Sequence, residues 1–365
     1  MKTKYTLFTE VTSFYTDLLS ALSQARHGIS LMYFTFDHGL WSDKIGRVLR
    51  AKAVRGFKVR LMVDQVGLVA DTPKNTFRNR TLMRELQAAG IQVDIFRPHG
   101  PRLNQFNRLH CKVCAIDHKT AFIGGSNIGD HYPDMRDTNL RLDGDLGATF
   151  HGLYDYICQF SSGSISKSSR DHKMYRMCLS NLQQLEDIRV LFTLPGHRQD
   201  IRRALVKLIL EADQEIYICT WYFLPDREIL NALLSQAENG VKVHIILSHR
   251  TRIPLIDAAN YIAGHRLTKA GAQVHRYTDR YMHSKVAWNN RGDIIVGSAN
   301  IDEKALSSNF ECCLQINNEN LIDELKRAFE IDRRHCRLQT RKTLRNRSVS
   351  HQAISYVCSY AGAWL

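Results

Sequence analysis

Residues 110–127 of this 365-residue chain read HCKVCAIDHKTAFIGGSN, and residues 283–300 read HSKVAWNNRGDIIVGSAN. Both stretches carry His, Lys, a glycine-serine run and Asn at matching offsets. In each stretch, the first glycine of that run is the fourteenth residue after the His. Four residue types at fixed offsets, with a serine displaced by one residue, indicate one structural unit that occurs twice. We expect the two units to combine into one site.

The residue types in each copy suit phosphate chemistry. The His and the Lys are two residues apart, so on the β-strand that we predict there they point to the same side. Imidazole serves as a nucleophile or as a general acid and base near neutral pH, and lysine adds a positive charge. Turns after the next strands add hydroxyl and amide donors. The predicted site therefore contains His110, Lys112, Ser126, Asn127, His283, Lys285, Ser298 and Asn300.

The repeat extends over most of the chain. Matching apolar stretches occur in the same order in both halves, and amphipathic helical patterns lie between them, at 45–54 and 229–237. Each half thus alternates helices with strands, which predicts an α/β domain that occurs twice. The matching stretches are 25–36 with 212–223, 56–63 with 240–247, and 89–93 with 270–274.

The domain boundaries follow from a break in this pattern. Serines concentrate between 161 and 169, and such a polar stretch is typical of a linker. We predict a first domain at 1–165, a linker at 166–183, a second domain at 184–335 and a C-terminal tail at 336–365. The tail is basic and ends in apolar and aromatic residues. This pattern fits either an anionic membrane surface or a helix that packs on the domain.

The composition restricts the partners and the compartment. Fifty Lys and Arg against 36 Asp and Glu give a net charge of +14, which favours an anionic partner, either nucleic acid or an acidic membrane surface. The nine cysteines show no disulfide framework, and the N-terminus lacks a signal-peptide pattern, so we expect a cytoplasmic protein. No apolar run approaches the roughly 20 residues of a membrane span, so any membrane contact would be peripheral. We expect neither a metal nor another cofactor, because Lys112 shares a strand face with His110 and repels a cation.

The repeated motif resembles the signature of the phospholipase D superfamily: His-x-Lys, four residues, Asp, six residues, then Gly-Ser or Gly-Gly, and Asn. The first copy fits completely and includes Asp117. The second copy has Asn290 where the family has Asp. Asparagine keeps the shape and an acceptor oxygen of aspartate but loses its charge.

The resemblance implies a fold and a mechanism. Two tandem domains, each a mixed sheet flanked by helices, would pack with pseudo-twofold symmetry around an active site at their interface. His110 would attack phosphorus to form a phosphohistidine, and His283 would act as acid and base. Asp117 and Asn290 would complete the two catalytic motifs, and the lysines, serines and asparagines would bind the phosphate. Asp137 and Glu311 occupy the family's positions for orienting the histidines.

Further segments, at 122–132, 136–144 and 222–226, resemble bacterial cardiolipin synthases. The resemblance implies transfer of a phosphatidyl group from one phosphatidylglycerol to the hydroxyl of another, or use of phosphatidylethanolamine as the donor or acceptor, at the bacterial inner membrane. A hydrolase that releases phosphatidic acid, a nuclease and a non-catalytic membrane-binding protein remain as alternatives. No nucleic-acid module is recognisable, which favours a phospholipid over nucleic acid, and nothing indicates a protein partner.

Overall fold

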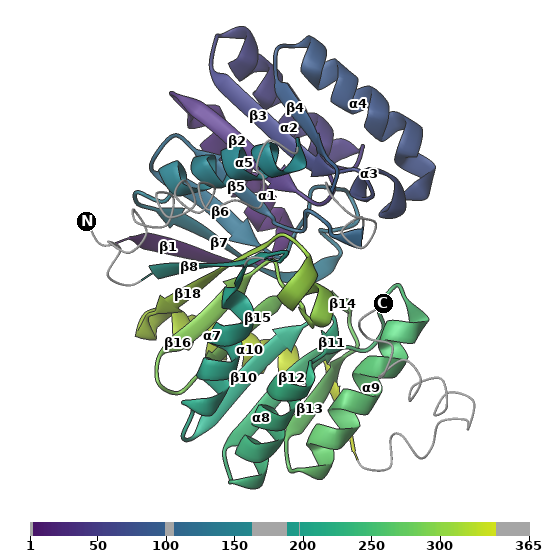
Figure 1. The fold of residues 1–365 in the computed structure, drawn as a ribbon, viewed down its shortest axis with the longest axis vertical. Coiled ribbons are helices and arrows are strands. Elements are labelled where there is room, and N and C mark those ends of the chain that lie inside the picture. The colour runs from purple at the N-terminus through teal and green to yellow at the C-terminus, as the bar shows by residue number, and fades with distance from the viewer. Residues whose placement is uncertain (1–2, 99–105, 163–187, 197, 341–365) are drawn as a thin grey trace.

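The computed structural model describes residues 3–98, 106–162, 188–196 and 198–340. They form two α/β domains that lie one after the other along the long axis of the molecule (Figure 1). The predicted linker lies outside the described residues, as does most of the predicted tail. None of the described helices combines the length and the hydropathy needed to cross a membrane.

The first domain is built on a mixed sheet. Strands β2, β3 and β4 are parallel, and their connections contain the helices α2 (Leu40–Val54) and α4 (Thr76–Ala88). The remaining strands of the main path pair antiparallel, and a short strand of the second half, β14 (Tyr281–Met282), pairs with β7. The strand order is β1 (Lys4–Glu10), β7 (Met135–Asp143), β6 (Thr120–Gly124), β5 (Val113–Ile116), β2 (Gly28–Tyr33), β3 (Lys58–Asp64) and β4 (Gln92–Phe96).

The second domain repeats this order strand for strand. It adds one short strand at each edge, β9 (Arg198–Gln199) and β19 (Cys336–Leu338). Because β19 pairs with β13, the second domain extends beyond the predicted boundary at residue 335. The equivalent strands are β8 (Ile188–Leu194), β18 (Glu311–Asn317), β16 (Asp293–Gly297), β15 (Lys285–Asn289), β10 (Glu215–Thr220), β12 (Lys242–Ser248) and β13 (Gln273–Tyr277).

The helices cover both faces of each sheet, as the apolar periodicity predicts. In the second domain, α8 begins where the Asp226 side chain accepts a hydrogen bond from the Ile229 backbone, at 2.9 Å. Asn318 caps α10 in the same way, through the Leu321 backbone at 3.0 Å, and such caps stabilise a helix by about 1 kcal/mol. The remaining elements are α1 (Val11–Gln24), α3 (Gly67–Ala70), η1 (Pro73–Asn75), α5 (Gly147–Ser161), α7 (Asp200–Leu210), α8 (Arg227–Glu238), β11 (Phe223–Leu224), α9 (Pro254–Lys269), β17 (Ile301–Asp302), η3 (Lys304–Ser308) and α10 (Glu319–Arg334).

Three hydrophobic cores hold the molecule together. Two lie within single domains, beneath α1, α2 and α4 in the first and beneath α7, α8 and α9 in the second. The third contains residues of both domains, among them Phe150 and Tyr154 of α5 and Trp288 and Phe329 of the second domain. Burial of apolar surface therefore fixes the domains against each other, and the interface can hold a precisely arranged site.

Candidate active site

The two His-x-Lys segments meet at the domain interface. They are extended but lie just before or at the start of their strands, since β5 begins at Val113 and β15 at Lys285. The prediction that they lie inside strands is therefore wrong by a few residues. Across the interface, the His110 backbone N–H donates to the Phe310 carbonyl at 2.9 Å, and that of His283 donates to the Arg136 carbonyl at 2.7 Å.

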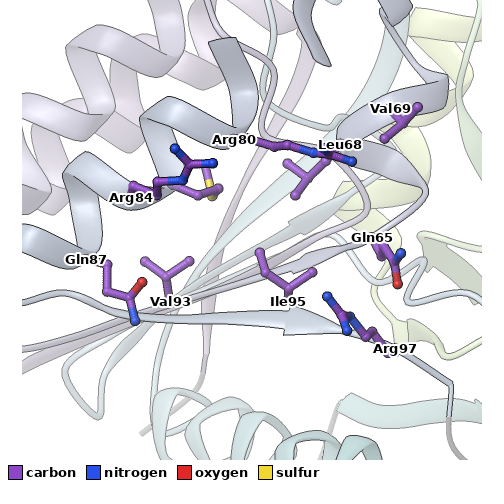
Figure 2. A pocket seen from close by; sticks show the side chains of 10 residues that line it. Gln65, Leu68, Val69, Arg80, Arg84, Gln87, Val93, Ile95 and Arg97 are labelled. Carbon is purple, nitrogen blue, oxygen red and sulfur yellow. The ribbon is translucent and has the colours of Figure 1, made fainter. Parts of the chain in front are cut away.

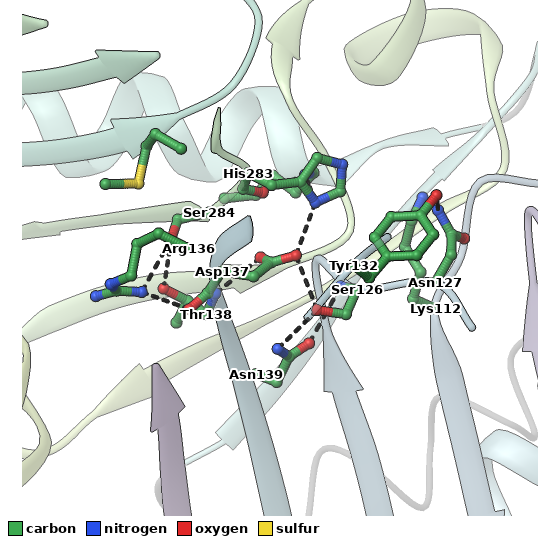
Figure 3. Close-up of polar contacts among 12 residues, drawn as sticks. Lys112, Ser126, Asn127, Tyr132, Arg136, Asp137, Thr138, Asn139, His283 and Ser284 are labelled. Carbon is green, nitrogen blue, oxygen red and sulfur yellow. Dashed lines mark hydrogen bonds and ion pairs between the residues drawn. The ribbon is translucent and has the colours of Figure 1, made fainter. Parts of the chain in front are cut away.

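This backbone pairing places a carboxylate of each domain beside the histidine of the other domain. Because Phe310 precedes Glu311 and Arg136 precedes Asp137, each carboxylate comes beside the histidine of the other half. His110 Nδ1 lies 2.6 Å from Glu311 Oε1, and His283 Nδ1 lies 2.7 Å from Asp137 Oδ2 (the latter in Figure 3). With Nδ1 held by a carboxylate, Nε2 is the nitrogen of each ring that is left for a substrate.

Burial sets the charge states of both histidines. It lowers the pKa of His283 to about 3, and the Lys285 ammonium acts in the same direction, while Asp137 opposes the shift. For His110, burial again lowers the pKa well below its usual value, and Lys112 and Lys285 add to the effect. Both imidazoles are therefore neutral at neutral pH. A neutral imidazole is the form that attacks an electrophile.

The pKa values of the two buried carboxyl groups, Glu311 and Asp137, are shifted in opposite directions. Burial raises the pKa of Glu311 to about 8, although Lys112 and Ser298 oppose the shift. Burial also acts on Asp137, but His283 and Lys285 outweigh it and hold the pKa of Asp137 below its ordinary value. The two halves of the site are thus related in geometry and unequal in charge.

The lysines are buried beside the histidines. Lys112 is 1% exposed and Lys285 is 3% exposed. The Nζ of Lys112 donates to the His110 carbonyl at 2.7 Å, and Lys285 makes the equivalent contact with His283. Burial lowers the pKa of Lys112 to about 7 and that of Lys285 to about 8. A bound phosphate anion would compensate these buried charges, because opposite charge favours the protonated amine.

The serines of the repeat contact the carboxylates. Ser126 Oγ donates to Asp137 Oδ2 at 2.9 Å (Figure 3), and Ser298 Oγ donates to Glu311 Oε2. Asn139 also donates to Ser126 Oγ, at 2.9 Å. The serines therefore position the groups that position the histidines, which differs from the expected direct role in phosphate binding.

The two asparagines of the repeat are not equivalent. Asn127 donates through Nδ2 to the Tyr132 hydroxyl at 2.8 Å and accepts from the Thr35 backbone at 3.3 Å. Asn300 is 4% exposed, and its Oδ1 is buried without a hydrogen-bond partner among the described residues. Of the two side-chain amides, only that of Asn300 has an oxygen, Oδ1, that makes no hydrogen bond within the described residues and could contact a ligand.

Asp117 and Asn290 lie away from the histidines. Asp117 follows β5, whose four residues separate it from Lys112. Its carboxylate accepts from the backbone N–H groups of Arg26, His27 and Gly28 at 2.7–3.2 Å. Asn290 Oδ1 accepts from the equivalent backbone of residues 213–215 at 3.1–3.3 Å. This placement corrects the expected catalytic role to a structural one.

Two aromatic residues lie beside the histidines, and sequence reasoning assigned neither of them to the site. The Phe34 ring centroid lies 5.6 Å from that of His110, and Trp221 lies 4.4 Å from His283. The lysine of each domain lies over the same ring, Lys112 near Phe34 and Lys285 near Trp221. The signal was present in the repeat, because residues 25–36 align with 212–223 and place Phe34 opposite Trp221.

Polar contacts also join the domains next to the site. Arg252 donates to Asp71 of the first domain at 2.9 Å, and the Tyr132 hydroxyl donates to the same carboxylate at 3.0 Å. Behind Asp137, buried Arg136 pairs with Asp332 at 2.8 Å. Within the described ranges, no three His, Cys, Asp or Glu residues are arranged to hold a metal ion.

Comparison with known proteins agrees with this geometry. The family model described as "Cardiolipin synthase, PLD-like domain" matches residues 18–142 and 205–333, once in each domain. Cardiolipin synthase 1 of Bacillus cereus is 28% identical over 349 residues, which cover 92% of this chain and 67% of that protein. Cardiolipin synthase B of Salmonella typhi is 30% identical over 337 residues, 86% of this chain and 77% of that protein.

Solved structures share the two-domain fold. The crystal structure of a phosphatidylserine synthase from Haemophilus influenzae Rd KW20 superposes with a TM-score of 0.75 at 17% identity, covering 98% of this chain and 93% of that one. A polyphosphate kinase from Porphyromonas gingivalis superposes with a TM-score of 0.59 at 15% identity, over 91% of this chain and 50% of the kinase. At these identities the likeness concerns the fold.

Proposed function

We propose that this chain, which belongs to the PLD-like domain family of the cardiolipin synthases, is a phosphatidyltransferase that forms cardiolipin from phosphatidylglycerol. The second lipid is phosphatidylglycerol or phosphatidylethanolamine. The observation that carries the proposal is the crossed arrangement of the histidines. Each imidazole has its Nδ1 on a carboxylate of the other domain and its Nε2 available.

The two histidines take different roles in this proposal. Burial and the positive charges of Lys112 and Lys285 lower the pKa of His110, which keeps it neutral and suits it to attack phosphorus. Asp137 raises the proton affinity of His283, and a bound phosphodiester anion raises it further, which suits His283 to carry a proton. This assignment agrees with the roles that the family resemblance implies.

The reaction then proceeds in two displacements. His110 Nε2 forms a bond to phosphorus, the bond from phosphorus to the head-group oxygen breaks, and His283 Nε2 gives that oxygen its proton. The head-group alcohol leaves, glycerol from a phosphatidylglycerol donor or ethanolamine from a phosphatidylethanolamine donor, and a phosphatidyl-histidine remains. The head-group hydroxyl of a phosphatidylglycerol acceptor next gives its proton to His283 and attacks phosphorus, which releases His110. Lys112 and Lys285 stabilise the charge on the non-bridging oxygens, and the amide of Asn300 provides a further polar contact.

We further propose that the protein acts at the cytoplasmic face of the membrane as a peripheral protein. The net charge of +14 favours an anionic lipid surface. Both substrates are lipids of that surface, so the protein must reach their head groups. A hydrolase would share the first displacement and differ only in water attacking the intermediate.

Lipid mass spectrometry tests this function. The purified protein is incubated with phosphatidylglycerol vesicles, with and without phosphatidylethanolamine, beside His110→Ala and a matched His27→Ala variant at an exposed position. We expect cardiolipin and glycerol from the unchanged protein and from His27→Ala, and neither product from His110→Ala. Phosphatidic acid alone would assign a hydrolase, and the absence of any lipid product would overturn the proposal.

A further inference from the structure

A second pocket lies at the edge of the first domain. It has a volume of about 410 Å³ and opens between α3, α4 and the edge strand β4 (Figure 2). None of its lining residues belongs to the His-x-Lys segments. A pocket of this size is typical of sites for small molecules or lipid head groups.

Side-chain alternation gives the pocket an apolar floor. Along β4, Val93 and Ile95 point into the pocket, while Asp94 points to the opposite face, where its carboxylate accepts from the Tyr154 hydroxyl at 2.6 Å. Leu68 of α3 and Met83 of α4 complete the apolar lining. The pocket therefore excludes the acidic side chain of its own strand.

Three arginines surround this floor. Arg80 and Arg84 extend from successive turns of α4, and Arg97 extends from the end of β4 (Figure 2). No Asp or Glu lines the pocket. Within the described part of the chain, none of the three guanidinium groups forms an ion pair. Guanidinium groups bind phosphate oxygens in pairs of hydrogen bonds, so this cluster is complementary to a phosphate.

We propose that this pocket binds the phosphate head group of an anionic membrane phospholipid, with the start of its acyl chains on the apolar floor. The site is separate from the two substrate positions at the histidines and holds the enzyme on an anionic membrane. The role as an anchor rests on the proposed function, because it places the active site next to its lipid substrates.

The pocket lies close to the active site along the chain. Asp64 accepts a hydrogen bond from the Leu109 backbone at 2.8 Å, directly before His110. The next turn, α3, supplies Leu68 and Val69 to the pocket. The pocket and the segment before His110 therefore both adjoin the end of β3.

An exposed aromatic residue supports the membrane orientation. Phe77, at the start of α4, is 76% exposed. It precedes Arg80 by three residues and Arg84 by seven, so all three lie on one side of the helix. An exposed phenylalanine beside basic residues is typical of helices that bind at a lipid interface.

Vesicle binding in a His110→Ala background tests the pocket without turnover. Arg80→Gln/Arg84→Gln is compared with the matched pair Arg203→Gln/Arg327→Gln, which removes two exposed arginines of the second domain. The vesicles contain phosphatidylcholine, either alone or with three parts in ten of phosphatidylglycerol. Each arginine near an anionic surface contributes roughly fivefold in affinity, so the pocket variant should bind the anionic vesicles about 25-fold more weakly.

The controls distinguish lipid binding in the pocket from non-specific attraction of arginines to an anionic surface. We expect less than a twofold change for Arg203→Gln/Arg327→Gln, and no displacement by inorganic phosphate at the concentration of the lipid phosphate. Equal losses for both double variants, or displacement by inorganic phosphate, would overturn the anchor. In the active protein, Arg80→Gln/Arg84→Gln should lower turnover on vesicles and keep it on detergent-dispersed lipid. Loss in both assays would also overturn it, whereas a protein that binds vesicles without producing cardiolipin would contradict the proposed function and leave the pocket intact.

Discussion

The crossed pairing predicts that Asp137 is coupled in energy to His283 of the other domain, and not to His110 of its own. Asp137 is fully buried and His283 is 2% exposed, with 2.7 Å between the bonded atoms. A buried hydrogen bond to a charged group stabilises a protein by about 1.5–3 kcal/mol. We therefore expect a coupling free energy of about 2 kcal/mol between Asp137 and His283.

A double-mutant cycle measures this coupling. The free energy of unfolding in urea is determined for Asp137→Asn, His283→Gln and the double variant, all of which keep the side-chain volume. The matched cycle combines Asp137→Asn with His110→Gln, and its coupling should stay within about 0.5 kcal/mol because these residues belong to different pairs. Circular dichroism of each variant checks that the fold is kept.

Two results would refute the reasoning. A coupling of Asp137 with His110 as large as that with His283 would mean that each domain orients its own histidine. No coupling in either cycle would mean that the carboxylates do not hold the histidines at all. In the assay for cardiolipin, Asp137→Asn should lower kcat by roughly 10²–10⁴, since an amide favours the wrong tautomer of the imidazole, as in serine proteases.

Three further predictions concern the same site. Rapid quenching during turnover should give a phosphorus adduct on the peptide that contains His110, and an adduct on the His283 peptide would reverse the two roles. Because the pKa of His283 is lowered to about 3, its contribution to stability is complete above pH 6.5 and is lost as the pH falls from 6.5 toward 3. His283→Gln should therefore reduce the slope of unfolding free energy against pH between 6 and 4.5 by about 1.4 kcal/mol per unit, and an unchanged slope would contradict the burial argument. Asn290→Asp should lower the urea midpoint and keep turnover, and adding Asp213→Asn should restore the midpoint; a loss of turnover with an unchanged midpoint would return Asn290 to the active site.

Much of the fold was predictable from the sequence. The repeat of apolar stretches in the same order predicts two α/β domains, and the identical strand order of the two sheets confirms them. Side-chain periodicity decides which elements form, because burial of apolar faces dominates the free energy of folding. The periodicity says little about short edge strands. It missed β19, whose three residues join the second sheet through backbone pairing.

The composition of the site was predictable, but its connections were not. The spacing of the motifs identifies the histidines, lysines and serines as residues of the site. The exchange of Asp137 and Glu311 between domains depends instead on backbone hydrogen bonds of Phe310 and Arg136 across the interface. Such contacts join residues far apart in sequence, and neither Phe310 nor Arg136 belongs to the motif.

The departure at Asn290 has a local explanation in the structure. In the first domain, Asp117 accepts hydrogen bonds from the backbone N–H of Arg26, a basic residue. The repeat places Asp213 at the position of Arg26, and its carboxylate accepts a hydrogen bond from Asn290 Nδ2. An aspartate at 290 would set two carboxylates against each other. The charge of the side chain at position 290 is therefore explained by the charge at position 213. It does not depend on the chemistry at the histidines.

The crossed site also explains why the two halves can be unequal. Each domain supplies a histidine whose carboxylate belongs to the other domain, so neither half-site is complete alone. The transfer reaction itself is unequal, because one imidazole forms a bond to phosphorus while the other carries a proton. Glu311 beside His110 has its pKa raised to about 8, whereas Asp137 beside His283 stays ionised. The ionised Asp137 favours the protonated form of His283, which suits a proton carrier, whereas burial and the charges of Lys112 and Lys285 keep His110 neutral, which suits a nucleophile. Duplication of one unit thus supplies the geometry, and in the proposed mechanism the unequal surroundings of the two histidines supply the division of roles.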